Sequence, residues 1–261
     1  MRIEFVTQDD SLYILPFFDE FLRHYGEDFD IVQISASRSM GKRSRIQLVK
    51  ELGALYGPLG VARLATRSAT ARVIGKLARP KGATRYYTLS QLCHAYSIPY
   101  ARIGNPNAPS FLESTRQRSP DVLVSVACPY ILKEALLKVA PGGAINIHHA
   151  PLPRYKGMMP TFWQMFYGEK SVGVTVHYMS PKLDEGPTLL RSEQSIQEGE
   201  SLDHLIQRSK RYGAHCVARV LKQLQNGPVS PVQTNDAAAS YFTFPTLSEI
   251  REFRRRGLRA I

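Results

Sequence analysis

The feature that most constrains the fold is the alternation of short apolar strands with helical segments through the first 150 residues. The clearest strand is Asp121–Ala127, a nearly continuous apolar run that is typical of a strand buried on both faces. Further strand patterns occur at Arg2–Thr7, Asp30–Ala36, Tyr100–Ile103 and Ala144–His148. This order predicts a doubly wound, mostly parallel sheet with helices on both faces.

Helical periodicity fills the gaps between these strands. The expected helices are Leu12–Tyr25, Leu59–Leu77, Thr88–Ser97, Pro109–Arg118 and Ile131–Val139. Beyond residue 150, Gly173–Met179 alternates strictly and is expected to form a hairpin with Thr188–Ile196. Ser201 then begins a long helix that Asn226-Gly227-Pro228 ends.

Ligands of such sheets bind at the carboxyl ends of the strands. Two common glycine-rich signatures are missing: no GxGxxG follows the first strand, and no GxxxxGK[ST] occurs in the chain. The sequence therefore argues against an ordinary NAD enzyme and against a P-loop NTPase.

The 261 residues allow one large domain with an appendage. We expect a catalytic domain over residues 1–226, with an insertion at 38–85, and a C-terminal extension at 227–261. The three cysteines are far apart and form no CxxC pair, which indicates a reducing compartment without a zinc or disulfide framework. No secretory signal and no bilayer-length apolar run is present, so we expect a soluble cytoplasmic protein.

The positive charge is concentrated in one segment. The chain carries 34 Lys and Arg against 22 Asp and Glu, a net charge of +12. Residues 38–85 hold twelve of these basic residues and a single acid, Glu51. This concentration predicts an insertion that has a surface or a partner of its own.

Within the insertion, residues 59–79 have the pattern of a basic amphipathic helix. Basic residues recur at steps of three to five, and apolar residues at steps of four form a stripe: Val61, Ala65, Ala69, Val73 and Leu77. Four interpretations remain open: a peripheral membrane contact, an anionic ligand, RNA, or a solvated basic face on a helix packed against the core.

Three polar residues carry the candidate chemistry. Asn146 and His148 lie two positions apart at the end of a predicted strand, so their side chains project from one face. The amide can stabilise a developing oxyanion, and the imidazole can exchange a proton near neutral pH. Asp184, in the turn of the predicted hairpin, adds a carboxylate. The three groups together suit acyl transfer, whereas each residue alone is compatible with a structural role.

A longer string around these residues is more specific. It reads Asn146-x-His148, Leu152-Pro153-x-x-x-Gly157, Gly168-Glu169, Gly173-x-Thr175 and Leu183-Asp184-x-Gly186. In order and spacing it resembles the formyltransferase family, which uses 10-formyltetrahydrofolate and includes enzymes acting on glycinamide ribonucleotide, methionyl-tRNA and sugar amines. The resemblance is strong over 118–225, weaker over 1–36, and fails over 37–87. It implies a Rossmann-like sheet of the formyltransferase type.

The resemblance also implies a mechanism without a metal. A substrate amine would attack the formyl carbon carried on N10 of the folate, while Asn146 and His148 stabilise the oxyanion. Asp184 would orient His148 through an ordered water and help to move the amine proton. The family's folate cradle corresponds to Tyr130, Ile131, Leu132, Ser180, Pro181, Lys182, Leu183 and Asp184.

Departures from the family pattern bear on the acceptor. His149 follows the motif histidine, and we interpret it as structural, with a substrate contact as the alternative. Met158 stands where some members carry Arg. Thr7-Gln8-Asp9-Asp10 replaces the Gly-Ser-Asn loop of the glycinamide enzyme, which argues against a purine substrate.

The expected acceptor is a nucleotide-linked amino sugar for surface polysaccharide, a small-molecule substrate whose diphosphate could meet the Arg residues. Methionyl-tRNA is the alternative: the basic insertion suits RNA, but such relatives carry a further C-terminal barrel, and only about 35 residues follow the last long helix here. A binding module built on an inactive enzyme is a third interpretation, which the retained residues oppose. Tyr241–Phe244 and the helix Leu247–Arg256 are a candidate homodimer interface.

Overall fold

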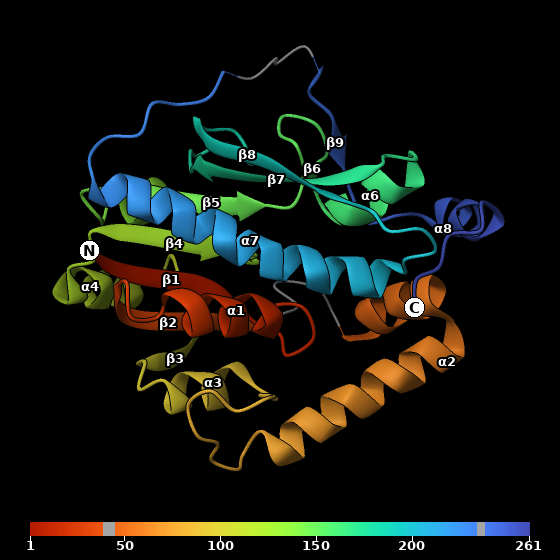
Figure 1. Cartoon of the computed structure of the whole chain (residues 1–261), viewed down its shortest axis with the longest axis horizontal. Helices are drawn as coiled ribbons and strands as arrows, with labels where there is room; N and C mark the ends of the chain where they lie inside the picture. Colours follow the sequence, from red (N-terminus) through yellow and green to blue (C-terminus); the bar gives the residue numbers. More distant parts are fainter. Residues whose placement is uncertain (39–44, 234–237) are drawn as a thin grey trace.

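The computed structural model describes residues 1–38, 45–233 and 238–261. Its central element is a seven-stranded sheet of order β3-β2-β1-β4-β5-β7-β8 (Figure 1). The strands are β1 (Arg2–Asp9), β2 (Asp30–Arg38), β3 (Tyr100–Ile103), β4 (Val122–Val126), β5 (Ala144–His148), β7 (Ser171–Tyr178) and β8 (Thr188–Ser195). β1 to β5 pair in parallel, and β7 pairs antiparallel with β5 and β8. The predicted doubly wound, mostly parallel sheet is confirmed.

Helices cover both faces of the sheet. They are α1 (Leu15–Tyr25), α2 (Arg45–Ile74), α3 (Leu89–Ala95), α4 (Pro109–Arg118), α5 (Glu134–Leu137), α6 (Pro160–Phe166), α7 (Leu202–Gln225) and α8 (Leu247–Arg255). Alternation within β4 shows the two faces: Val124 packs in a core with α1, α3 and α7, while Leu123 packs with α4 and α5. Every residue of β4 is buried, as its apolar run predicts.

The insertion differs from its prediction in extent and orientation. α2 begins at Arg45, and Gly57, with φ of 69°, interrupts its helical geometry just before Pro58. The expected boundary at Gly57-Pro58 is therefore a kink, and the helical turns before it were missed. Of the predicted apolar stripe only Val61 packs against a hydrophobic cluster, whereas Ala65, Ala69, Val73 and Leu77 are exposed; Leu64 and Ala71 are buried instead. Predicted insertion residues 39–44 lie outside the described part of the chain.

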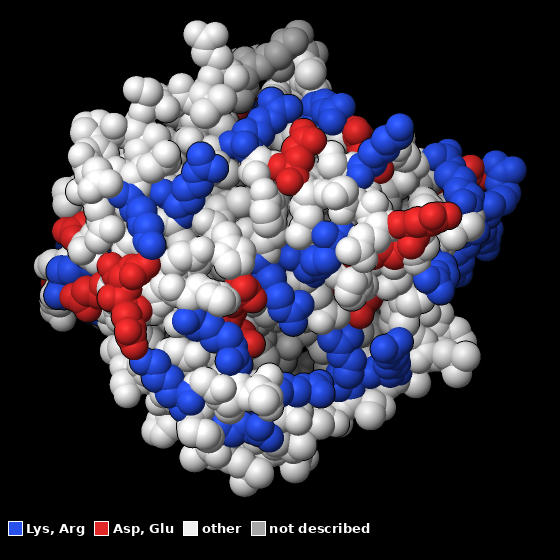
Figure 2. Space-filling view, viewed as in Figure 1, with Lys and Arg blue, Asp and Glu red and all other residues white. Residues whose placement is uncertain are grey.

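The insertion and the C-terminal extension share a second hydrophobic core. Leu55 and Leu64 of α2 lie in it with α6 and α8. Phe253 of α8 is fully buried and stacks on Phe162 of α6 with ring centroids 4.7 Å apart. Figure 2 shows a dense group of Lys and Arg over α8, with further basic residues distributed across the rest of this face. Among the described residues, no helix is long and apolar enough to cross a membrane.

The aromatic segment offered as a dimer interface is used within the chain. β9 (Tyr241–Phe242) pairs in parallel with β6 (Lys156–Gly157), a two-residue strand that follows β5. The ring of Phe242 stacks on Trp163, with centroids 4.7 Å apart. Tyr241, by contrast, is 60% exposed. Phe242 and Phe253 are thus occupied by packing inside one chain.

Candidate functional site

His148 and Asp184 face each other directly. Nδ1 of His148 lies 3.7 Å from Oδ1 of Asp184, and each side chain is only 9% exposed. Nε2 of His148 donates to the carbonyl oxygen of Tyr155 at 2.9 Å. A singly protonated ring can donate to only one of these two oxygens, whereas a doubly protonated ring can donate to both. The imidazole is therefore placed to take up or release a proton beside a carboxylate.

Asp184 is held by the backbone of the loop after β5. Its Oδ2 accepts the N–H of Gly157 at 2.9 Å. Gly157 has φ of 92°, and a Cβ there would lie 2.3 Å from the carbonyl oxygen of Phe242. Only glycine fits this close approach. Because Oδ1 of Asp184 lies 3.7 Å from Nδ1 of His148, the carboxylate is close enough to orient the imidazole, and the expected role of an ordered water between them stays a prediction.

Asn146 is oriented by a histidine that the sequence analysis missed. Register across β5 and β7 pairs Asn146 with His177, and Nδ2 of Asn146 donates to Nε2 of His177 at 3.2 Å. Nδ1 of His177 donates to the carbonyl of Tyr178 at 2.8 Å, which leaves Nε2 as an acceptor. Burial lowers the pKa of His177 to about 4, so its ring stays neutral near pH 7. The sequence signal for His177 was its place in the alternating pattern of β7. Its pairing with Asn146, however, depends on the register of β5 against β7.

The loop after β5 supplies both backbone partners of the His148–Asp184 pair, and the C-terminal extension fixes that loop. Ser240 makes three hydrogen bonds to it. Its Oγ accepts the N–H of Tyr155 at 2.9 Å, its carbonyl accepts that of Lys156 at 2.9 Å, and its N–H donates to the carbonyl of Pro153 at 3.2 Å. The extension therefore determines where the carbonyl of Tyr155 and the N–H of Gly157 lie.

Pairing of β6 with β9 continues beyond Ser240. The N–H of Met158 donates to the carbonyl of Phe242 at 2.8 Å, and the indole N–H of Trp163 donates to the carbonyl of Thr243 at 3.0 Å. Met158, which departs from the family pattern, thus takes part in holding the loop through its backbone.

The first predicted cradle segment is extended rather than helical. The expected helix Ile131–Val139 shrinks to α5, because the side chain of Asn107 binds the preceding backbone on both sides. Its Nδ2 donates to the carbonyl of Ile131 at 2.9 Å and its Oδ1 accepts the N–H of Lys133 at 2.7 Å. Leu132 is buried, Tyr130 is half-buried, and Ile131 remains 63% exposed.

The second cradle segment is a polar turn that is fixed by its own hydroxyl. Oγ of Ser180 donates to the carbonyls of Lys182, at 3.2 Å, and of Glu185. Pro181 and Lys182 are exposed, and the apolar side chain of Leu183 is 44% exposed. Met179, which precedes this turn, packs in the same apolar cluster as Leu132, so the two predicted cradle segments adjoin one cluster.

His149 points away from His148 and into the protein. Its Nδ1 lies 2.9 Å from Oγ of Ser209 on α7, and its buried Nε2 has no hydrogen-bond partner among the residues that the structure describes. Burial lowers the pKa of His149 well below the ordinary value. These contacts agree with the structural interpretation of this residue.

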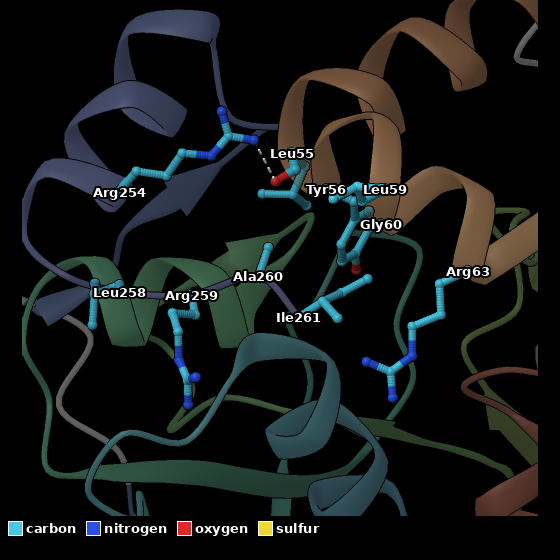
Figure 3. A pocket seen from close by; sticks show the side chains of 10 residues that line it. All are labelled: Leu55, Tyr56, Leu59, Gly60, Arg63, Arg254, Leu258, Arg259, Ala260 and Ile261. Atoms are coloured by element: carbon cyan, nitrogen blue, oxygen red, sulfur yellow. Dashed lines mark hydrogen bonds between the residues drawn. The ribbon is translucent and has the colours of Figure 1, made fainter.

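A hollow of about 430 Å³ lies elsewhere, between α2 and the C-terminal extension (Figure 3). It is lined by Leu55, Tyr56, Leu59, Gly60, Arg63, Arg254, Leu258, Arg259, Ala260 and Ile261. None of these residues belongs to the Asn146–His148–Asp184 centre. Arg254 is engaged, because its Nη2 donates to the carbonyls of Ala54 and Leu55. Acid–base groups converge at the centre rather than in this hollow.

Comparison with known proteins identifies the family of the chain. The formyl transferase family model matches residues 47–221, which includes most of the segment 37–87 that the sequence analysis placed outside the resemblance. The methionyl-tRNA formyltransferase of Pelobacter propionicus is 37% identical over 166 residues, 62% of this chain and 52% of the relative. The chain thus spans about half the length of that relative.

Solved structures share the fold. Glycinamide ribonucleotide transformylase 1 of Symbiobacterium toebii superposes with a TM-score of 0.59 at 14% identity, over 87% of this chain and 88% of that one. WlaRD, a sugar 3N-formyl transferase solved in the presence of dTDP and 5-N-formyl-THF, gives 0.54 at 13% identity, over 93% and 69%. Among the described residues, no cluster of His, Cys, Asp or Glu suits a metal ion. On the family match, the chain belongs to the formyl transferase family.

Proposed function

We propose that this protein transfers a formyl group from 10-formyltetrahydrofolate to a primary amine. The observation that carries the proposal is the approach of His148 to Asp184, at 3.7 Å, on the strand that also presents Asn146. An amide donor, an imidazole and a carboxylate within one small region are the groups that acyl transfer to an amine requires.

The folate, when bound, supplies the activated formyl carbonyl. Asn146 uses one amide hydrogen on His177, and its second hydrogen is available for the carbonyl oxygen of the formyl group. The ring of His148, whose two nitrogens face the carbonyl of Tyr155 and Asp184, would place positive charge beside this oxygen when it is protonated. Asp184 would stabilise the charged imidazole and receive the proton from the attacking amine. As the bond between the formyl carbon and N10 breaks, the His148–Asp184 pair would return a proton to N10, so that tetrahydrofolate leaves as a neutral amine.

The residues after β4 and after β7 would hold the folate. Ile131 and Leu183 keep apolar side chains exposed beside turns whose backbone is fixed by Asn107 and Ser180. Apolar surface with a few fixed polar groups suits a flat pterin ring. The proposed holding residues remain Tyr130, Ile131, Leu132 and the turn Ser180–Asp184.

For the acceptor, methionyl-tRNA takes precedence over the amino sugar. The methionyl-tRNA formyltransferase of Pelobacter propionicus supports this choice at 37% identity, whereas the sugar enzyme WlaRD resembles this chain at 13%. A nucleotide-linked amino sugar is the second acceptor to test. Cys93, Cys128 and Cys216 are free thiols, which supports the cytoplasm as the proposed compartment.

The test is a direct assay with both acceptors. The protein is incubated with 10-formyltetrahydrofolate and either initiator methionyl-tRNA or a panel of nucleotide-linked amino sugars, and formylated product and released tetrahydrofolate are measured. We expect methionyl-tRNA to give the higher kcat/KM. Formylation of an amino sugar alone would change the acceptor, and transfer to no amine would overturn the proposed reaction.

A further inference from the structure

The outward face of α2 is apolar where a solvent-facing helix is usually charged. Residues at alternating steps of three and four share one face of a helix. On α2 beyond Gly57 such a row is exposed throughout, and it consists of Leu59, Ala62, Thr66, Ala69 and Val73. Leu59 is 87% exposed and Val73 71%, and Leu77, just after the helix, is 63% exposed. We call these six residues the outer face.

The opposite side of the same helix packs against the rest of the protein. Leu64 and Ala71 are buried against the body of the protein. Arg67 reaches inward and forms an ion pair with Asp203 of α7 at 3.2 Å. The helix therefore does not need to turn its outer face toward the core, and the exposure of that face is a property of the folded chain.

Basic residues flank the outer face on both sides. Arg63, Arg72 and Lys76 are exposed, and none of them forms an ion pair with a residue that the structure describes. No Asp or Glu occurs in the sequence between Glu51 and Glu113. An apolar strip edged by positive charge is thus exposed along α2, and it begins at Leu59 and Arg63 on the rim of the hollow beside the C-terminal extension. α2 itself runs along the lower edge of the molecule, apart from the central sheet (Figure 1).

We propose that this face of α2 docks on an anionic lipid bilayer. A helix that lies in the plane of a bilayer places apolar residues among the acyl chains and basic residues at the headgroups, which is the arrangement found here. A second copy of the chain would bring the basic edges of two outer faces together, and like charges repel. RNA would use the basic residues but leave Leu59, Val73 and Leu77 exposed.

The test uses the purified full chain and vesicle flotation. Vesicles of phosphatidylcholine alone are compared with vesicles that also contain phosphatidylglycerol. We expect binding to the anionic vesicles only, and a decrease as salt rises. The Val73→Asp/Leu77→Asp double variant should lose at least tenfold in affinity. Removing the charge of Arg63, Arg72 or Lys76 with Gln should weaken binding about fivefold each.

A matched control tests whether vesicle binding depends on the outer face in particular or on any exposed leucine. Leu247 of α8 is 61% exposed, and Leu247→Asp should bind anionic vesicles like the wild type. Formyl transfer without vesicles should be unchanged in all these variants, so that failure of docking and failure of the proposed reaction are distinguishable. The proposal is overturned if anionic vesicles are not bound at low salt or if the double variant binds normally. It is also overturned if the double variant instead dissolves a dimer or abolishes RNA binding.

Discussion

The centre around His148 and the outer face of α2 differ in the exposure of their side chains. At the centre, His148 and Asp184 are almost completely buried, and backbone groups from the loop after β5 bind both of them. On α2, apolar side chains such as Val73 are exposed, although the helix is firmly packed on its other side.

The difference distinguishes a site whose buried polar groups are hydrogen-bonded within the chain from a surface whose apolar residues are left uncovered. Buried polar groups are costly unless they are hydrogen-bonded, so the partners of His148 and Asp184 indicate a site that is organised before any ligand arrives. Exposed apolar residues gain free energy only when something covers them. The following predictions test whether the two regions are independent.

Removing a member of the centre should have the largest effect. We expect His148→Ala and Asp184→Ala each to lower kcat by at least about 100-fold, because each loses a group that stabilises charge in the transition state. Steady-state kinetics measures the loss, and thermal unfolding shows that the fold remains. His204→Ala, at an exposed position of α7, is the control. Turnover like that of the wild type in either variant would contradict the assignment.

Protonation of His177, which binds Asn146 of the centre, should lower the stability of the fold. Its pKa is about 4 in the fold against an ordinary 6.5, so the unfolded chain binds more protons between these values and stability falls as pH falls. At pH 5 this one residue should cost about 2 kcal/mol relative to pH 7. Urea unfolding of the wild type and of His177→Gln at both pH values measures the difference. An equal pH dependence in both proteins would show that His177 is not buried as a neutral ring.

Weakening the loop should have a smaller effect than removing the centre. Ser240→Ala removes the acceptor for the N–H of Tyr155 and should cost about 1 kcal/mol of stability. Because this loop presents the partners of His148 and Asp184, we expect kcat to fall roughly tenfold with little change in KM. Ser248→Ala on α8 is the matched control. A KM effect alone would place Ser240 in substrate binding rather than in positioning.

Changes on the outer face should affect turnover least. Val73→Asp/Leu77→Asp alters exposed side chains that make no contact with the centre, so kcat/KM in vesicle-free solution should stay within about twofold of the wild type. The acceptor assay described above measures this directly. A large decrease would show that α2 belongs to the catalytic site and that the two regions are not separate.

The sequence predicted best those strands and helices that a single local pattern determines. The apolar run of β4 and the proline-started helix α4 were predicted because their signals are local and strong. Asn146 and His148 were placed on one face because strand alternation alone determines it.

The remaining features depend on contacts between distant segments. β6 and β9 have two residues each, too few for any periodic signal, yet they bring Ser240 to the loop after β5. The Asn146–His177 contact needs the register of β5 against β7. Periodicity predicted an apolar stripe on the insertion but left its surroundings open, because it shows which residues share a face, not which way that face points.

The central claim is that the formyl carbon is attacked between Asn146, His148 and Asp184. A crystal structure of the wild-type chain with a folate analogue that carries a non-transferable formyl group tests it most directly. We expect the formyl oxygen within hydrogen-bonding distance of Nδ2 of Asn146 and beside the imidazole of His148, with the pterin against Ile131 and the turn at Ser180–Asp184. Density for the analogue in the arginine-lined hollow between α2 and α8, or a formyl group remote from all three side chains, would contradict the account.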